Sequence, residues 1–351
     1  MSVIGEAQVR KARAVTLWYL ALYHDTPDDI GVVRMFTDPT RLGHFAVLMD
    51  DVRAGQPAAL SRLLMATVMF QRRQDLQIMR VLRGISAADA DELASPPSLL
   101  ALARGSGCRH LETNATLLAG CDLHKDQDGR GACGAEPAIA CAPKRHAVLL
   151  KRYGHFGRVP TSIALNLLAW GAADLPALRQ RALNEGANPS DAAERLERML
   201  CGSWRVSDKI AAMYLSMLSN PDLCPGVAPW EPGLDWTRWV VIDSNVDLFL
   251  GWLGYEGYGT YAARRSFLQS LASEIDLSEL KPSLRSYNPR IVQQAAYLFM
   301  SVTNRRALDS DCSKREGACD SCPRILRDGC PSRTAGVTPK QPSDPACAGL
   351  G

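Results

Sequence analysis

Four cysteines late in the sequence have a spacing suited to metal chemistry. Cys312, Cys319, Cys322 and Cys330 follow the pattern C-x6-C-x2-C-x7-C. Four thiolates this close in sequence can surround a small cluster without ligands from elsewhere in the chain. The alternatives are a zinc site and unrelated cysteines. Zinc sites usually have two short Cys-containing knuckles, and only one is present here, so the spacing favours zinc less. The spacing therefore predicts an iron–sulfur cluster, written here as [4Fe-4S].

Three upstream segments carry a resemblance to a known family. Residues 199–211 read MLCGSWRVSDKIA, residues 240–246 read VVIDSNV, and residues 63–75 read LLMATVMFQRRQD. Together with the cysteines they resemble the endonuclease III family of helix-hairpin-helix DNA glycosylases. That family has a hairpin L-P-G-h-G-x-K-x-A followed by a run similar to V-D-T-H. The resemblance covers roughly residues 60–330, apart from two insertions.

The resemblance implies roles for individual residues. Lys209 falls on the family's lysine and Asp243 on its catalytic aspartate. Asn245 stands where a histidine is often found, and Gln71 falls on a glutamine that contacts DNA. The implied chemistry is cleavage of an N-glycosidic bond in a flipped-out base, with Asp243 stabilising positive charge on the sugar and Lys209 attacking C1′.

The sequence departs from the family pattern at several points. Arg205 and Ser207 replace the two hairpin glycines, and the last cysteine gap is seven residues instead of five. We expect Ser207 to keep the turn tight and Arg205 to contact a DNA phosphate through its side chain. The alternative interpretations are ordinary ones, with Asp243 as a helix N-cap and Lys209 as a solvated helix residue.

The expected function is a DNA base-excision enzyme that also acts as an AP lyase through Lys209. Two alternatives stay open. One is a monofunctional glycosylase in which Lys209 only contacts DNA, and the other is a non-catalytic iron–sulfur protein that binds DNA or senses redox state. The base that is excised cannot be read from these motifs.

Two insertions contain further residues of interest. The first, at about 105–143, is predicted to be a loop or small insertion, and a second metal, zinc, is a candidate there. The second, 220–239, is rich in Pro, Gly and Trp. Its tryptophans either stack on a flipped base or wedge into the duplex, or they pack between the two lobes. The residues concerned are Cys108, His110, Cys121, His124, Cys133 and Cys141 in the first insertion, and Trp230, Trp236 and Trp239 in the second.

Apolar residues at helical spacing dominate the rest of the chain and predict an all-α fold. The segments concerned are 58–70, 147–153, 163–170, 192–200, 209–218 and 291–302, with Ser190-Asp191 and Asn288-Pro289 as N-terminal signals. Residues 240–242 are either a short strand or the lead into a helix. From the resemblance we expect two helical lobes, 56–240 and 1–55 plus 241–330, with DNA between them and a disordered tail over 331–351.

Composition limits the remaining possibilities. The formal charge of +3 is mild, so any interaction with nucleic acid must come from local features. The first apolar run, at 14–23, is too short and is followed by HDTPDD, which is not a signal-peptide pattern. No stretch approaches the length of a membrane span. We expect a monomer that binds double-stranded DNA in the cytoplasm, at the bacterial nucleoid, or in the nucleus of a eukaryote.

Overall fold

The computed structural model describes residues 4–71, 73–121, 141–151, 156–255, 259–308, 310–315 and 317–333. In these ranges every regular element is a helix and no strand occurs, which confirms the all-α prediction. Residues 240–242, the one candidate for a strand, are an extended lead into a helix. The predicted disordered tail lies outside the described residues from position 334 onward.

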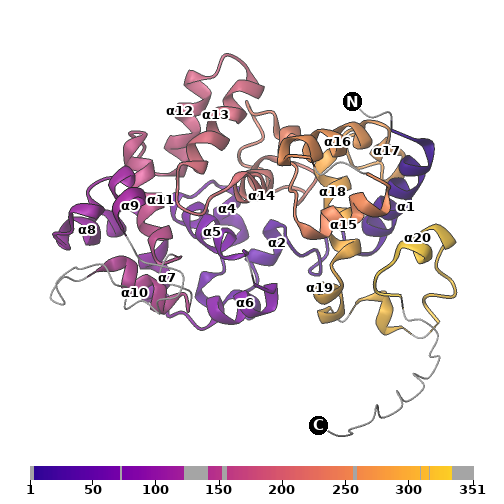
Figure 1. Cartoon of the computed structure of the whole chain (residues 1–351), viewed down its shortest axis with the longest axis horizontal. Coiled ribbons are helices and arrows are strands. Elements are labelled where there is room, and N and C mark those ends of the chain that lie inside the picture. The colour runs from indigo at the N-terminus through magenta and orange to yellow at the C-terminus, as the bar shows by residue number, and fades with distance from the viewer. Residues whose placement is uncertain are drawn as a thin grey trace, which may run out of the picture.

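The α-helices follow one another along the chain as shown in Figure 1. They are α1 (Glu6–Leu22), α2 (Val33–Phe36), α3 (Pro39–Leu42), α4 (Met49–Arg53), α5 (Pro57–Met69), α6 (Asp75–Arg83), α7 (Ala87–Ala94), α8 (Pro96–Gly105), α9 (Asn114–Gly120), α10 (Ala142–Leu149), α11 (Arg158–Ala169), α12 (Leu175–Glu185), α13 (Pro189–Cys201), α14 (Asp208–Ser219), α15 (Ser244–Trp252), α16 (Tyr261–Ser273), α17 (Leu277–Leu280), α18 (Pro289–Met300), α19 (Val302–Ala307) and α20 (Arg324–Gly329). Short 3-10 turns cover Gly43–Phe45, Arg109–Leu111, Trp236–Arg238 and Cys312–Lys314.

Asparagine caps followed by proline begin two of the helices that matter for the site. The Asn288 side chain accepts a hydrogen bond from Ile291 N, and Pro289 is the first residue of α18, as the sequence predicted. For α13 the cap is Asn188, which accepts from the backbone N–H groups of Ser190 and Asp191. The predicted start at Ser190-Asp191 was therefore two residues late. Asparagine oxygen satisfies backbone donors that have no partner within the first turn, and proline needs none.

Helix α18 is the central helix of one end of the molecule. It packs against α1, α15 and α16, and α1 also packs against α20. Figure 1 shows α1 from the N-terminal part of the chain among the helices that follow residue 240. A single hydrophobic core of buried residues runs from α1 to α20. The division into two lobes stays a prediction.

The first insertion, predicted to be a loop or small insertion, contains short helical elements. Its described part contains the 3-10 turn at Arg109–Leu111 and helix α9, which packs against α11. Thr113 caps α9 by accepting from Thr116 N. The sequence analysis did not identify this helix, because the glycine and cysteine content of the segment hid a short helix with a good cap. Residues 122–140 lie outside the described part.

The second insertion, 220–239, has only one short 3-10 turn and is held by its tryptophans. Trp230 and Trp239 are 3% and 0% exposed, and Trp230 packs edge-on against Tyr214 of α14. These two side chains are core residues, and their packing between two lobes stays a prediction. Trp236 is half-buried, and the Arg285 guanidinium lies 5.7 Å from its ring centre.

Candidate active site

Lys209 and Asp243 line the same pocket. Lys209 is the second residue of α14, and Asp243 is the residue just before α15. Both side chains, with Asn245, face a cavity of about 270 Å³. Three residues chosen from two separate sequence motifs are thus brought together by the fold.

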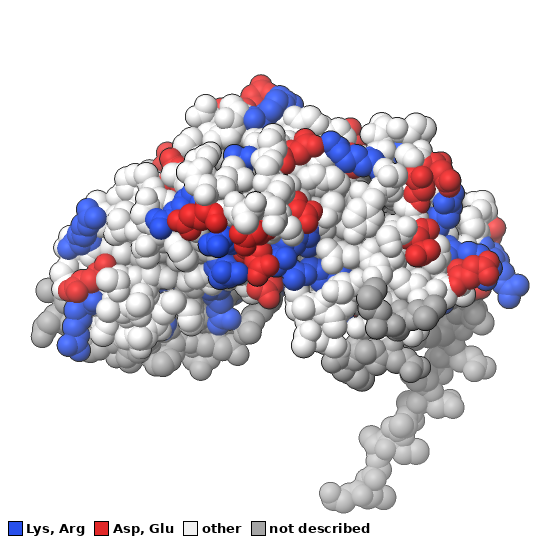
Figure 2. Space-filling view, turned by 90° about the horizontal axis from the view of Figure 1, so that it is seen from above, with Lys and Arg blue, Asp and Glu red and all other residues white. Residues whose placement is uncertain are grey.

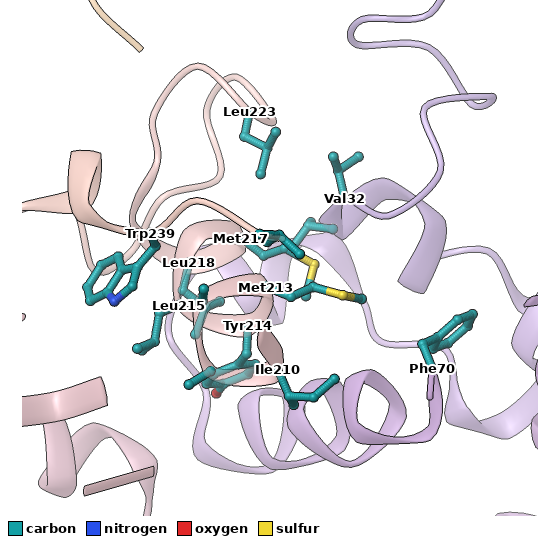
Figure 3. Close-up of a cluster of buried hydrophobic side chains, with 14 of the residues drawn as sticks. Val32, Phe70, Ile210, Met213, Tyr214, Leu215, Met217, Leu218, Leu223 and Trp239 are labelled. Atoms are coloured by element: carbon teal, nitrogen blue, oxygen red, sulfur yellow. The ribbon is translucent and has the colours of Figure 1, made fainter. Parts of the chain in front are cut away.

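Apolar side chains form one wall of this pocket. Phe70, at the end of α5, and Met213, one turn after Lys209 on α14, are both 8% exposed. Figure 3 shows them extending from the two helices into the same region, beside the core formed by Ile210, Tyr214 and Met217. The flat faces of a planar ligand in the pocket would pack against these side chains.

Asp243 caps a helix and also lines the pocket. One carboxylate oxygen accepts a hydrogen bond from Val246 N at 2.9 Å and caps α15. The other oxygen has no hydrogen-bond partner among the described residues, and the half-buried side chain lines the pocket. The cap fixes the carboxylate in place, so capping and a functional role are compatible in this residue.

The extended segment before Asp243 is held by a single tyrosine. The Tyr261 hydroxyl donates to Val240 O at 2.9 Å and accepts from Ile242 N at 3.3 Å. Val240, Val241 and Ile242 are buried, so this short β-branched run anchors the aspartate in the core. Burial raises the pKa of Tyr261 above its usual value, which keeps the hydroxyl neutral.

Asp75, the first residue of α6, is a pocket residue that the sequence analysis missed. Its carboxylate accepts from the Tyr297 hydroxyl at 3.1 Å and from Asn304 Nδ2 at 2.7 Å. Burial raises the pKa of Asp75, with a further increase from Asp243, and the Lys209 ammonium opposes this. Two carboxylates and one amine therefore interact across the cavity. The only sequence signal was an acid soon after Gln71.

Helices α13 and α14 form a helical hairpin around the turn 202–207. Buried polar side chains from α9 and α11 hold this turn. Asn114 Nδ2 donates to Gly202 O at 2.8 Å, Asn166 Nδ2 donates to Met199 O at 2.7 Å, and Trp204 N donates to Ser162 Oγ at 2.7 Å. A Cβ at Gly202 would lie 2.6 Å from Asn166 Oδ1, so only glycine fits.

Arg205 and Ser207 differ in what they require of the backbone. Arg205 has φ of 65°, in the left-handed region where glycine is favoured, and it stands where the resembled family has a glycine. Its guanidinium lies 5.4 Å from the Trp204 ring centre. Ser207 has ordinary extended angles and caps α14 without a side-chain hydrogen bond.

Gln71 lies against the hairpin and outside the Lys209 pocket. Its Nε2 donates to Arg205 O at 3.0 Å and to Val68 O at 2.7 Å. Gln71, Arg205 and Ser207 line a separate surface cavity of about 470 Å³. The predicted DNA-binding residues thus form one group around the hairpin turn, except for Asn245, which belongs to the pocket.

The cysteine quartet surrounds a third cavity. Cys312, Cys319, Cys322 and Cys330 all line a space of about 210 Å³. Burial raises the pKa values of Cys312 and Cys322. Among the described residues no group of three His, Cys, Asp or Glu side chains is close enough to share one metal ion. The sulfurs face a cavity, which is the arrangement that a cluster of several atoms requires.

A buried arginine, not predicted from the sequence, contacts this cavity. Arg305 is fully buried, and its guanidinium lies 3.1 Å from Cys312 Sγ and 3.6 Å from Cys330 Sγ. It also forms an ion pair with the buried Asp311 at 3.2 Å. Arg315 and Arg327, which stand between the cysteines in the sequence, also line the cavity.

The candidate zinc ligands in the first insertion are only partly described. Cys108 and Cys121 pack in a small apolar cluster with Leu111 and Leu117. His110 and Cys141 lie in the described residues, whereas His124 and Cys133 do not. The zinc site stays a prediction.

Charges are interleaved on the face shown in Figure 2, with a mixed acidic and basic group near its centre. This face has no broad field of one sign.

None of the described helices combines the length and apolar character needed to cross a membrane. In comparisons with known proteins, no family model, curated protein or solved structure matches this chain.

Proposed function

We propose that this chain is a DNA glycosylase of the helix-hairpin-helix type with an associated AP lyase activity. The observation that carries the proposal is the shared pocket of Lys209 and Asp243. A lysine and an aspartate chosen from separate motifs would not be expected to meet in one cavity by chance. The hairpin that precedes Lys209 supports the proposal, because it would place DNA beside the pocket entrance.

The proposed reaction uses both residues directly. A base flipped out of the duplex enters the pocket, and the N-glycosidic bond begins to break. Positive charge develops on the sugar, and the Asp243 carboxylate stabilises it. The neutral Lys209 amine attacks C1′, the bond electrons leave with the base, and a proton from the amine passes to the base. The C1′–O4′ bond then breaks, O4′ takes a proton from solvent, and the opened sugar is left as a Schiff base with Lys209. Loss of a proton from C2′ and cleavage of the C3′–O bond release the 3′ phosphate by β-elimination.

Residues around the hairpin are proposed to position the DNA. The turn 202–207 would lie along the DNA backbone, and the Arg205 guanidinium would make a charged contact to phosphate. Gln71 is bound to the Arg205 carbonyl, so it would enter the duplex from the same side. Phosphate contacts of this kind fix the register of the protein on DNA and carry no base specificity.

The four cysteines are proposed to hold a [4Fe-4S] cluster. The fit rests on the cavity that all four sulfurs line and on the buried Arg305, whose charge would offset that of the thiolates. When bound, the cluster would cross-link the segment 312–330 against α1 and α18. No step of base excision depends on it in this proposal.

Reductive trapping tests the proposal. The protein is incubated with duplexes that each carry one defined lesion or modified base, and sodium borohydride reduces any Schiff base formed. We expect base release and a covalent protein–DNA adduct. Lys209→Ala should lose the adduct, and Asp243→Asn should slow base release by about a hundredfold or more. Lys281→Ala is the matched control, because Lys281 contacts His24 at 2.8 Å outside the pocket.

The outcomes separate the alternatives. An adduct that persists in Lys209→Ala removes this lysine as the nucleophile. Base release with no adduct in the wild type indicates a monofunctional glycosylase. Full base release by Asp243→Asn assigns the activity to a contaminant and favours a non-catalytic DNA-binding protein.

A further inference from the structure

Helix α18 presents a buried polar face to the pocket. Arg290, Gln293, Gln294 and Tyr297 stand at positions i, i+3, i+4 and i+7, which is one side of a helix, and all four line the cavity. Arg290, Gln293 and Gln294 are only 2%, 1% and 1% exposed. Arginine and glutamine are seldom fully buried, so a whole face of them requires a reason.

Three members of this face, Arg290, Gln294 and Tyr297, already have hydrogen-bond partners. Arg290 donates to Ser216 Oγ at 3.1 Å, to Gln294 Oε1 at 2.8 Å and to Gly31 O at 3.4 Å. Of the five N–H groups of an arginine, two remain without a partner among the described residues. No carboxylate lies within ion-pair distance of Arg290 in the same residues. The pocket therefore has a buried cation that can donate further hydrogen bonds.

Gln293 has no such partners. Its Oε1 is buried without a hydrogen bond, and its Nε2 makes none with the described residues either. This conclusion does not depend on which way the amide is turned, because neither end is bonded. A buried amide in this state is unfavourable unless something else satisfies it. The side chain lines the cavity, so that partner can come from a ligand.

We infer that Gln293 and Arg290 read the edge of the flipped-out base and select bases with a carbonyl oxygen beside a ring N–H. This inference rests on the proposed glycosylase function. Arginine only donates, so it pairs with a carbonyl oxygen and opposes an exocyclic amino group. The glutamine amide both accepts and donates, so it matches an N–H next to that oxygen. Phe70 and Met213 would cover the faces of the ring.

Arg290 would also assist the departure of such a base. A base that leaves with the bond electrons carries negative charge, which its carbonyl oxygens share. A buried guanidinium donating to one of those oxygens stabilises the transition state more than the ground state. The neutral Gln293 supplies selectivity, and the charged Arg290 supplies both selectivity and rate.

Paired substrates that differ only at this edge test the inference. One pair is uracil and cytosine with the same 5-substituent, and the other is hypoxanthine and adenine, each placed singly in the same duplex. For each pair, kcat/KM for the carbonyl member is divided by kcat/KM for the amino member. Both values come from one protein preparation, so the fraction of folded protein does not affect the ratio. The wild type should favour the carbonyl member of at least one pair by about tenfold or more. Gln293→Met and Gln293→Leu should lower that ratio by about threefold or more, to the preference that Arg290 alone sustains.

The control variant is Val292→Ala, a buried residue of the same helix that does not line the pocket. It should lower stability and leave the ratio unchanged. A wild type that prefers the amino member, or a ratio that survives both Gln293 variants, overturns the inference and leaves the glycosylase proposal standing. No excision of any base by the wild type overturns both.

Discussion

Asp29 is a carboxyl group in the core, where burial disfavours its charged form. It is fully buried, accepts from the Tyr19 hydroxyl at 2.6 Å and from Gln294 Nε2 at 3.0 Å, and lies near Arg290. Burial raises its pKa from the ordinary 3.8 to about 7, although the hydrogen bonds and Arg290 oppose the increase. Gln294 links this carboxyl to Arg290, so its protonation state bears on the charge behind the pocket.

The folded pKa of Asp29 lies above the unfolded value, and this fixes the direction of its pH dependence. Its protonated form stabilises the fold fully below about pH 4, and that contribution is lost as the pH rises through 7. A difference of about 3 pKa units corresponds to about 4 kcal/mol. Asp29→Asn should therefore flatten the decline in unfolding free energy between about pH 4 and pH 8, measured by urea denaturation. A parallel decline in wild type and variant would contradict the burial argument.

The residues of the pocket were predictable to different degrees. Lys209 and Asp243 belong to short motifs, and the structure brings them together. Asp75 and Gln293 could not be found in this way, because polar residues within amphipathic helices are usually solvent-facing. Only the packing of α18 against three other helices shows that its polar face is buried.

At the scale of elements, the hairpin between α13 and α14 contains an arginine, Arg205, in a backbone conformation that favours glycine. Helix positions were predicted well by apolar periodicity and caps, as for α18 and its Asn288 cap. The conformation of Arg205 was not predictable, because arginine rarely adopts a positive φ. The hydrogen bonds from Asn114, Ser162 and Asn166 hold the turn in this shape despite its cost.

Substitutions at Arg205 separate the cost of the backbone from the function of the side chain. Arg205→Gly and Arg205→Ala both remove the guanidinium, so both should weaken DNA binding to the same extent. Arg205→Gly should be the more stable of the two by about 1 kcal/mol, because alanine retains the strain at a φ of 65°. Urea denaturation and DNA titration at fixed salt measure the two effects.

Asp208, the first residue of α14, provides the comparison. Its backbone is helical, so Asp208→Gly should be less stable than Asp208→Ala, which is the opposite order. If the glycine variant were less stable than the alanine variant at position 205 as well, the backbone at Arg205 would not be strained.

At the scale of the whole molecule, the cysteine cavity joins segments from both ends of the described chain. Trp18 of α1, Phe299 of α18 and Leu326 of α20 line it beside the four cysteines. The buried pair of Arg305 and Asp311 lies at the same place, and Tyr23 donates to Asp311 at 3.2 Å. A group that binds all four sulfurs would therefore stabilise the packing of α1, α18 and α20 together.

We expect protein purified without oxygen to be brown and to contain iron and acid-labile sulfide. Cys319→Ser should lower the iron content and the melting temperature, because one of the four ligands is lost. Cys224→Ser is the control, since Cys224 is buried and does not line this cavity. Colourless wild-type protein that lacks iron and sulfide would contradict the cluster and leave the Lys209 and Asp243 proposal untouched.

The packing of α1 against α18 and α20 also affects how the protein is made. Tyr23 and Asp311 are hydrogen-bonded in the native state, yet they stand 288 positions apart in the chain. At about 5 to 20 residues per second, a ribosome needs roughly 15 to 60 s to synthesise that interval. The apolar face of α1 therefore leaves the ribosome long before its partners exist. Co-expression of chaperones should therefore raise the yield of folded protein in an expression host.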